Sequence, residues 1–212
     1  MPTWNSEGWI HTDVRDHRTP NYDIAPLFVN RWSPRAMTGK PLDEDEFMPL
    51  FEAARWAPSS YNNQPWRFLY ATREDDHWNA YLDFLSAENK TWAKRAAVLV
   101  VILSKTTVDY NGEPSRTHSF DTGAAWQNLA LEGARRRLVV HGIGGFDYER
   151  AAATLSIPAV YTIEAMAAIG IRGPAKSLPA DLQEREEPSD RKSLDDIVNQ
   201  GAFDSVSEEG DE

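Results

Sequence analysis

The chain of 212 residues contains no cysteine, and this absence excludes several kinds of site. Disulfides, thiolate nucleophiles, zinc–thiolate sites and iron–sulfur clusters all require the cysteine sulfur. A chain of this length buries roughly 70% of the surface that it exposes when unfolded, so its core needs no covalent staple or structural metal. A cysteine-free composition also fits a reducing compartment, and we expect a cytoplasmic protein.

Long hydrophobic runs are missing as well. The longest one, from Ala96 to Leu103, has the length of a strand and is far shorter than the ~18 residues that a membrane helix requires. The first twenty residues lack a basic start followed by an apolar stretch, so we expect no signal peptide. We therefore expect no membrane partner.

Positive charge is scarce. The chain has 22 Lys and Arg residues against 33 Asp and Glu residues, which gives a net charge of −11. Such a chain repels the phosphates of nucleic acids, and we expect no nucleic-acid partner. The segment 204–212 (DSVSEEGDE) contains acidic residues and no basic ones, and we interpret it as an acidic disordered tail.

Signature motifs of several enzyme classes are also absent. None of the five histidines falls in HxH or HExxH spacing, which leaves a metal site without support, and no GxSxG motif indicates a hydrolase. The glycine cluster GIGG at 142–145 is not GxGxxG, because its sixth position is Asp147. Neither a Rossmann dinucleotide fold nor a Walker-A nucleotide site is therefore supported.

Hydrophobic periodicity predicts helices that alternate with strands. Asp43 and Glu46 form a capping-box pattern, although Pro49 favours a later helix start. On the longest helix, Phe120, Gln127 and Leu131 fall on the stripe that we expect to face inward. The expected helices span 23–30, 43–57, two pieces of 74–95, 117–138 and 147–156; the expected strands span 66–72, 96–104 and 163–171, and a last short element spans 194–199.

This pattern predicts an α+β fold with a mixed central sheet packed between helices. The apolar run that begins at Ala96 is continuous rather than alternating, which is typical of a central strand covered on both faces. We divide the chain into an N-terminal arm (1–20), one domain (21–203) and the acidic tail.

Three polar segments carry groups that suit a ligand. Residues 31–35 (RWSPR) place two arginines and a hydroxyl in one turn, which suits a phosphate or carboxylate but also a solvated basic turn. Residues 58–66 (PSSYNNQPW) offer amides that both donate and accept hydrogen bonds, as a heterocycle edge requires; an ordinary loop explains them too. Residues 141–147 (HGIGGFD) permit close backbone approach to a ligand, or simply end a helix.

Taken together, and in this order, the three segments resemble the nitroreductase family of flavoproteins. The resemblance extends over about residues 24–200 and includes SFDTGAAWQNLAL (119–131), AIGIRG (168–173) and RKSLDDIV (191–198). APSSYNNQPW is its most specific part. The chain departs from the family at Trp32 and Pro34, and at Arg137-Leu138-Val139 where glycines are common; these departures affect the shape of the substrate pocket more than flavin binding.

The resemblance implies a homodimer that binds FMN non-covalently at the subunit interface. It places Arg31 and Ser33 on the phosphate side, Arg35 near the N1 and O2 edge of the ring, and Arg191 on the phosphate. Gly144 and Gly145 correspond to the backbone that meets flavin N5, and no side chain is assigned a catalytic role because the flavin carries the chemistry. The amide Asn62 corresponds to the group that faces the pyrimidine edge, surrounded by Pro58, Ser59, Ser60 and Gln64.

The function implied by the resemblance is an FMN-dependent oxidoreductase. NAD(P)H would reduce the flavin in one half-reaction, and a small-molecule acceptor such as a nitroaromatic, a quinone or a flavin would reoxidise it in the second. Other flavin chemistry on the same fold, such as reductive dehalogenation or flavin fragmentation, and a non-catalytic flavin-binding protein are the alternatives. Bleaching of the flavin by NADPH without oxygen distinguishes a reductase from a binder.

Overall fold

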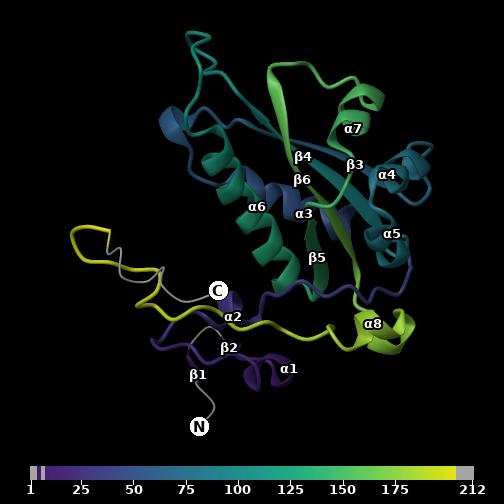
Figure 1. The fold of residues 1–212 in the computed structure, drawn as a ribbon, viewed down its shortest axis with the longest axis vertical. Coiled ribbons are helices and arrows are strands. Elements are labelled where there is room, and N and C mark those ends of the chain that lie inside the picture. Colours follow the sequence, from purple (N-terminus) through teal and green to yellow (C-terminus); the bar gives the residue numbers. More distant parts are fainter. Residues whose placement is uncertain (1–3, 6–7, 204–212) are drawn as a thin grey trace, which may run out of the picture.

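The centre of the fold is a four-stranded sheet with the strand order β3-β4-β6-β5 (Figure 1). The computed structural model describes residues 4–5 and 8–203. The sheet strands are β3 (Trp66–Thr72), β4 (Val98–Lys105), β5 (Leu138–Ile143) and β6 (Tyr161–Ile171). The predicted α+β class is confirmed, and the strand 66–72 has the predicted limits.

All three neighbouring strand pairs are antiparallel, which corrects the mixed pairing that we predicted. Thr72 at the end of β3 pairs with Val98 at the start of β4. The intervening helices α4 (Trp78–Phe84) and α5 (Ala87–Ala93) therefore leave and re-enter the sheet at the same end. A parallel pair needs a crossover to the opposite end, and this connection does not make one.

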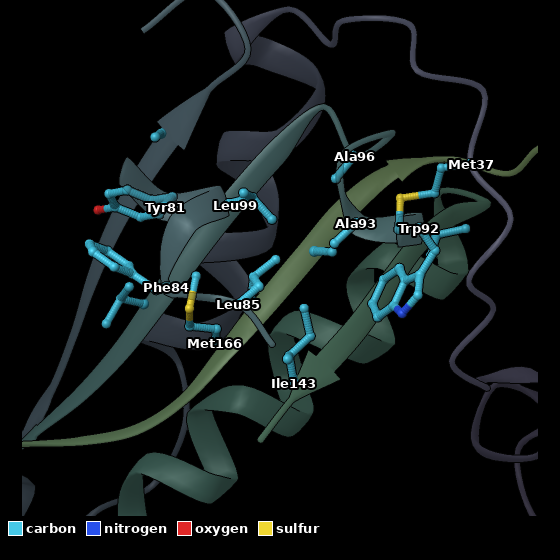
Figure 2. Close-up of a cluster of buried hydrophobic side chains, with 14 of the residues drawn as sticks. Met37, Tyr81, Phe84, Leu85, Trp92, Ala93, Ala96, Leu99, Ile143 and Met166 are labelled. Atoms are coloured by element: carbon cyan, nitrogen blue, oxygen red, sulfur yellow. The ribbon is translucent and has the colours of Figure 1, made fainter. Parts of the chain in front are cut away.

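Helices cover both faces of the sheet, as the continuous apolar strand predicts. Leu99 and Val101 point into a cluster with α4, α5 and α7 (Tyr148–Thr154), whereas Val98 and Val100 point into a cluster with α3 (Glu44–Arg55) and α6 (His118–Arg135). Figure 2 shows the first cluster, in which aromatic side chains from α4 and α5 surround the strand residues. Alternate residues of one strand thus supply two cores.

The start of α3 differs from the expectation of a delayed beginning. The helix begins at Glu44, directly after Asp43, and both hydrogen bonds of the capping box are present. The backbone N–H of Asp43 donates to Glu46 Oε2 at 2.8 Å. The reciprocal cap satisfies the N-terminal donors of the helix, and Pro49 is accommodated inside it.

The end of α6 also differs from the prediction. The helix ends at Arg135, and residues 138–143 form β5 instead of a further helical turn and a glycine loop. Arg137 adopts a left-handed conformation (φ 61°), which ends the helix because α-helical residues need a negative φ. Leu138, Val139 and Val140 then continue as a strand, as their shape favours.

The face of α6 that packs on the sheet is not the stripe that we predicted. Phe120 is 81% exposed and Gln127 is exposed, whereas Ala125, Leu129 and Gly133 are buried. Helical periodicity identifies apolar stripes but not which of them faces the protein. The exposed stripe of α6 is therefore an outer surface of this chain.

Two terminal segments lie together beside α2 (Pro26–Asn30). The arm contains a short hairpin of β1 (Trp4–Asn5) and β2 (Gly8–Trp9) and the helical turn α1 (Thr12–Arg15), and Val14 in that turn is fully buried. After the turns η2 (Ala175–Ser177) and α8 (Ala180–Gln183), the chain runs past α2 and away from the sheet (Figure 1).

The segment 194–199, where we predicted an element, contains turns rather than a helix or strand. The acidic segment 204–212 lies outside the described residues. In the part of the chain that the structure describes, no helix has the length and apolar character to cross a membrane.

Candidate functional site

The basic segment 31–35 follows α2 in an extended conformation that its neighbours fix. Arg31 is the C-cap of α2, with φ −72° and ψ 115°, and its Nη1 donates to Ser33 Oγ at 3.3 Å. At the other end of the segment, the backbone N–H groups of Arg35 and Ala36 donate to the carboxylate of Glu186 at 2.8–2.9 Å. The side chain of Arg35 is therefore presented from an anchored backbone.

A partly buried histidine on β5 supports the middle of this segment. His141 Nδ1 lies 2.9 Å from the carbonyl oxygen of Pro34; because a carbonyl only accepts, Nδ1 carries the proton. The imidazole packs against Trp92, with ring centroids 4.5 Å apart. Burial is the main cause that lowers the pKa of His141 to about 4, and the charges of Arg35 and Arg31 add to it. His141 is thus a neutral donor at neutral pH.

Arg191 and Arg31 lie in one electrostatic neighbourhood. The pKa of Arg31 is lowered by burial first and by the charge of Arg191 second. Within residues 4–5 and 8–203, no salt bridge joins a carboxylate to Arg18, Arg31, Arg35 or Arg191. In a chain with a net charge of −11, a group of arginines without carboxylate partners is suited to an external anion.

A groove of about 640 Å³ lies beside these arginines, between α2 and the C-terminal segment. Arg18 and Arg191 contribute its polar side, and Phe28, Leu194 and Ile197 contribute apolar side chains. A groove of this size can hold the polar end of a small molecule.

Residues 58–65, which we call the amide loop, form a tight turn before β3. Tyr61, Asn62 and Gln64 have positive φ values of 51°, 53° and 47°, a conformation that non-glycine residues rarely adopt. The loop keeps this strained form through internal bonds, since Gln64 N–H donates to Ser59 Oγ at 3.0 Å and Gln64 Nε2 donates to Asn62 O at 3.1 Å. Strain of this kind concentrates at functional sites.

The start of α6 fixes the amide loop in place. The backbone N–H of Ser60 donates to Asp121 Oδ2 at 3.1 Å, and the hydroxyl of Thr117 donates to the same oxygen. Asp121 is only 4% exposed. The buried carboxylate therefore holds the loop so that Pro58, Asn62 and Gln64 remain exposed.

A second groove of about 320 Å³ opens on the amide loop. Two exposed tyrosines, Tyr61 and Tyr110, flank it with their ring centroids 6.2 Å apart. Among the described residues, no hydrogen bond engages the side-chain amide of Asn62 as donor or acceptor, so this amide can pair with a ligand. The groove combines aromatic faces with a hydrogen-bonding edge.

Gly144 and Gly145 directly follow β5 and are exposed. A Cβ on Gly145 would lie 2.8 Å from Asn89 Nδ2, whereas a Cβ on Gly144 would meet nothing within 4 Å. The carbonyl of Gly145 accepts from Ser86 N–H at 3.1 Å and from Asn89 Nδ2 at 3.0 Å. The backbone of the pair is thus fixed beside open space.

The expected site residues fall into two groups in one chain. The amide loop leads into β3, and Gly144 follows β5, which are the two opposite edges of the sheet. Three strand spacings separate these edges by roughly 14 Å. Arg31 and Arg35 belong to the β5 side, because both act on His141 of that strand. In one chain the expected site residues therefore form two separate groups, which we call half-sites.

The sequence analysis did not predict the roles of several residues that support this geometry. Glu186 sits in an acidic run that looks solvated, and Arg18 lies in the arm outside the recognisable motifs. His141 precedes the glycine cluster, and its place in an otherwise apolar stretch was the one available signal. In the described part of the chain, no cluster of His, Asp and Glu could hold a metal ion.

Comparison with known proteins connects this geometry to a family. The family model for the nitroreductase family matches residues 29–91 and 76–171. A solved oxidoreductase containing FMN is 42% identical, with 88% of this chain and 96% of that chain covered and a TM-score of 0.85. A nitroreductase family protein from Streptococcus pneumoniae TIGR4 is 19% identical, with 82% and 98% covered and a TM-score of 0.66.

A curated relative comes from Rhodopseudomonas palustris (strain TIE-1) and carries the name "Putative NADH dehydrogenase/NAD(P)H nitroreductase". It is 25% identical over 151 residues, which are 61% of this chain and 74% of the relative. The family model spans more than half of this chain and includes the basic segment, the amide loop and both glycines. The chain belongs to the nitroreductase family.

Proposed function

We propose that this protein is an FMN-dependent oxidoreductase that takes reducing equivalents from NAD(P)H. The observation that carries the proposal is that one chain combines a group of arginines without carboxylate partners, a strained amide loop and an exposed glycine pair. FMN has a phosphate that arginines can bind, a heterocycle edge that the amide loop can pair with, and a flat ring that the glycine backbone can approach closely. The 42% identical solved relative contains FMN, and the relative named NAD(P)H nitroreductase supports the reductant.

The donor set fits FMN at each of its parts. Arg31, Ser33 and Arg191 would bind the phosphate, because guanidinium groups match its geometry. Asn62 and Gln64 would face the pyrimidine edge of the ring, with Ser59 and Ser60 shaping the loop. The backbone of Gly144 and Gly145 would approach N5. When bound, FMN supplies the hydride and electron chemistry.

Arg35 has a role separate from the phosphate side. Its backbone is held by Glu186 and its neighbour Pro34 is held by His141. A positive charge held near the ring stabilises negative charge that develops there on reduction. His141 stays neutral near pH 7, so its place in the site is to orient Pro34 rather than to add charge.

We propose further that the functional unit is a homodimer. The two half-sites occupy opposite edges of the sheet, so a second copy that sets its amide loop against the basic segment of the first would complete each site. Exposed apolar side chains support this arrangement: Phe120 on α6 is 81% exposed, and Ile197 and Phe203 on the C-terminal segment are 61% and 80% exposed. Large apolar surfaces of this kind are typical of obligate interfaces.

The acceptor that this geometry favours is a flat aromatic molecule, such as a nitroaromatic or a quinone. Tyr61 and Tyr110 offer exposed rings beside the amide loop, and stacking between aromatic faces is favourable. NAD(P)H and the acceptor would then use one site in turn, in two half-reactions.

The test of function is a titration of flavin-free purified protein with FMN. NADPH and NADH are then added separately in the absence of oxygen. We expect quenching of flavin fluorescence on binding and bleaching of the bound flavin by a reduced nicotinamide. Added nitroaromatic or quinone should restore the oxidised spectrum. An unchanged flavin spectrum refutes the proposal, and a bound flavin that neither nucleotide bleaches identifies a flavin-binding protein instead.

The dimer is tested by light scattering on two matched variants. Phe120→Glu adds a charge to the outer face of α6 and should give monomers with weakened FMN binding. Asn79→Glu adds the same charge to an exposed position on α4, across the sheet, and should leave the dimer unchanged. A monomeric wild-type protein that binds FMN contradicts the two-chain site.

A further inference from the structure

Arg18 lies in the N-terminal arm, before the residues that match the family model. Its side chain is almost completely enclosed, with the residue 8% exposed. Nη1 donates to the carbonyl oxygens of Val29 at 2.7 Å and Arg31 at 2.8 Å, and Nε donates to that of Ser189 at 2.7 Å. Each acceptor is a neutral carbonyl. Burying a guanidinium without a paired carboxylate is unfavourable, so packing alone does not account for an arginine here.

Two of these bonds fix the start of the basic segment. Val29 and Arg31 lie at the C-terminal end of α2, where the last carbonyl groups lack partners within the helix. A basic side chain is a favourable donor at such an end. The bond to the Arg31 carbonyl holds the extended conformation that directs the Arg31 side chain toward Ser33.

The third bond joins Arg18 to the C-terminal segment. The carbonyl oxygen of Ser189 accepts from Arg18 Nε at 2.7 Å and also from Arg191 Nη1 at 3.2 Å. Because both guanidinium groups share one acceptor atom, they lie next to each other. Arg18 and Arg191 also line the same groove.

Three positive charges therefore gather in one place. Burial, followed by the charges of Arg191 and Arg31, lowers the pKa of Arg18 to about 10, while Asp190 acts in the opposite direction. Like charges at short range are mutually repulsive. A bound dianion turns this repulsion into attraction, since all three guanidinium groups then face an opposite charge.

We propose that Arg18 is a positioning residue for the phosphate of FMN. It ties together the two backbone segments that carry Arg31 and Arg191, so that both side chains converge, and it adds a third positive charge behind them. The inference rests on the proposed FMN site and adds to it a residue from the arm. The arm thereby becomes part of the cofactor site.

The test compares FMN with riboflavin, which has the same ring and no phosphate. Both are titrated into apo-protein of the wild type and of Arg18→Gln at low salt. We expect the variant to bind FMN about tenfold more weakly, which corresponds to about 1.4 kcal/mol, with riboflavin affinity unchanged. A purely structural role predicts equal losses for both ligands, and equal losses overturn the proposal, as does an unchanged FMN affinity.

Two further variants separate charge, geometry and attachment of the arm. Arg18→Lys keeps the charge but lacks the planar fork that reaches three carbonyls. We therefore expect it to decrease the ratio of FMN affinity to riboflavin affinity, but by less than Arg18→Gln does. An unchanged ratio in Arg18→Lys overturns the proposal, and this test holds even where Arg18→Gln does not fold. Asp13→Asn breaks the ion pair between the arm and Arg172 without changing Arg18, and its ratio should equal that of the wild type. A changed ratio in Asp13→Asn assigns the effect to the arm as a whole and overturns a specific role of Arg18.

The failure of this inference is distinguishable from failure of the proposed function. Wild-type protein that binds neither flavin contradicts the FMN site itself. Wild-type protein that binds FMN no more tightly than riboflavin remains a flavoprotein, but its arginines are not a phosphate site and the role of Arg18 is refuted.

Discussion

Replacing His141 by asparagine should flatten the pH dependence of stability on the acidic side of neutrality. Burial lowers the pKa of His141 to about 4 in the folded chain, from its ordinary value of 6.5. The unfolded chain therefore binds the proton at a higher pH than the folded chain does. The stability contributed by neutral His141 is complete above the unfolded pKa and is lost as the pH falls from about 6.5 toward about 4.

The magnitude follows from the two pKa values. A full difference of this size corresponds to about 3 kcal/mol, and linkage gives a loss of about 2 kcal/mol between about pH 7.5 and about pH 5. Asparagine does not titrate in this range, and its amide N–H₂ can replace Nδ1 as the donor to the Pro34 carbonyl. The wild type should therefore lose about 2 kcal/mol more than His141→Asn over this interval.

Urea unfolding of apo-protein at fixed protein concentration, followed by tryptophan fluorescence, measures this difference. Equal losses of stability in the wild type and in His141→Asn would falsify the burial argument. Nuclear magnetic resonance titration of the His141 ring provides an independent check, since a pKa near the ordinary value contradicts it directly.

Four other substitutions test separate parts of the site and the core. Arg191→Gln should weaken FMN binding by roughly ten- to a hundredfold and leave the flavin reduction potential unchanged, whereas Arg35→Gln should lower that potential. Titration measures the FMN affinity and spectroelectrochemistry measures the potential. A shift of potential from Arg191→Gln alone would contradict the roles proposed for the two arginines. Gly133→Ala places a Cβ 2.3 Å from Val140 Cγ2 and should destabilise the fold by about 1–3 kcal/mol. In urea unfolding, adding Val140→Ala should restore part of the lost stability. If it restores none, the strain does not come from the contact with Val140. Asp121→Ala leaves the backbone N–H of Ser60 in the amide loop without its acceptor and should lower the free energy of unfolding by about 1–3 kcal/mol. Proteolysis of the loop should become faster. An unchanged rate of cleavage would mean that the internal bonds of the loop keep its conformation without Asp121.

Much of the fold, and the family, could be predicted from the sequence. The apolar run at β4 required cover on both faces, because no polar residue interrupts it, and α4, α5 and α6 supply that cover. Asp43 and Glu46 mark the observed start of α3, since a capping box satisfies N-terminal donors of the helix, although Pro49 led us to expect a later start. The basic segment, the amide loop and the glycine pair identified the nitroreductase family, because each is a local arrangement of donors that a continuous stretch of chain encodes.

The relations between distant segments could not be predicted from the sequence, because they depend on how the chain packs. The amphipathic pattern of α6 did not reveal that Phe120 points outward, because a helix with two apolar stripes leaves the choice to its neighbours. Leu138, which we predicted as the last residue of the helix, belongs to a strand because it pairs with Ile171 of β6. The roles of His141, Glu186 and Arg18 depend on carbonyl and N–H groups far along the chain, and such groups have no residue identity that a sequence can display. Long-range hydrogen bonding, rather than residue type, connects these three side chains to the candidate site.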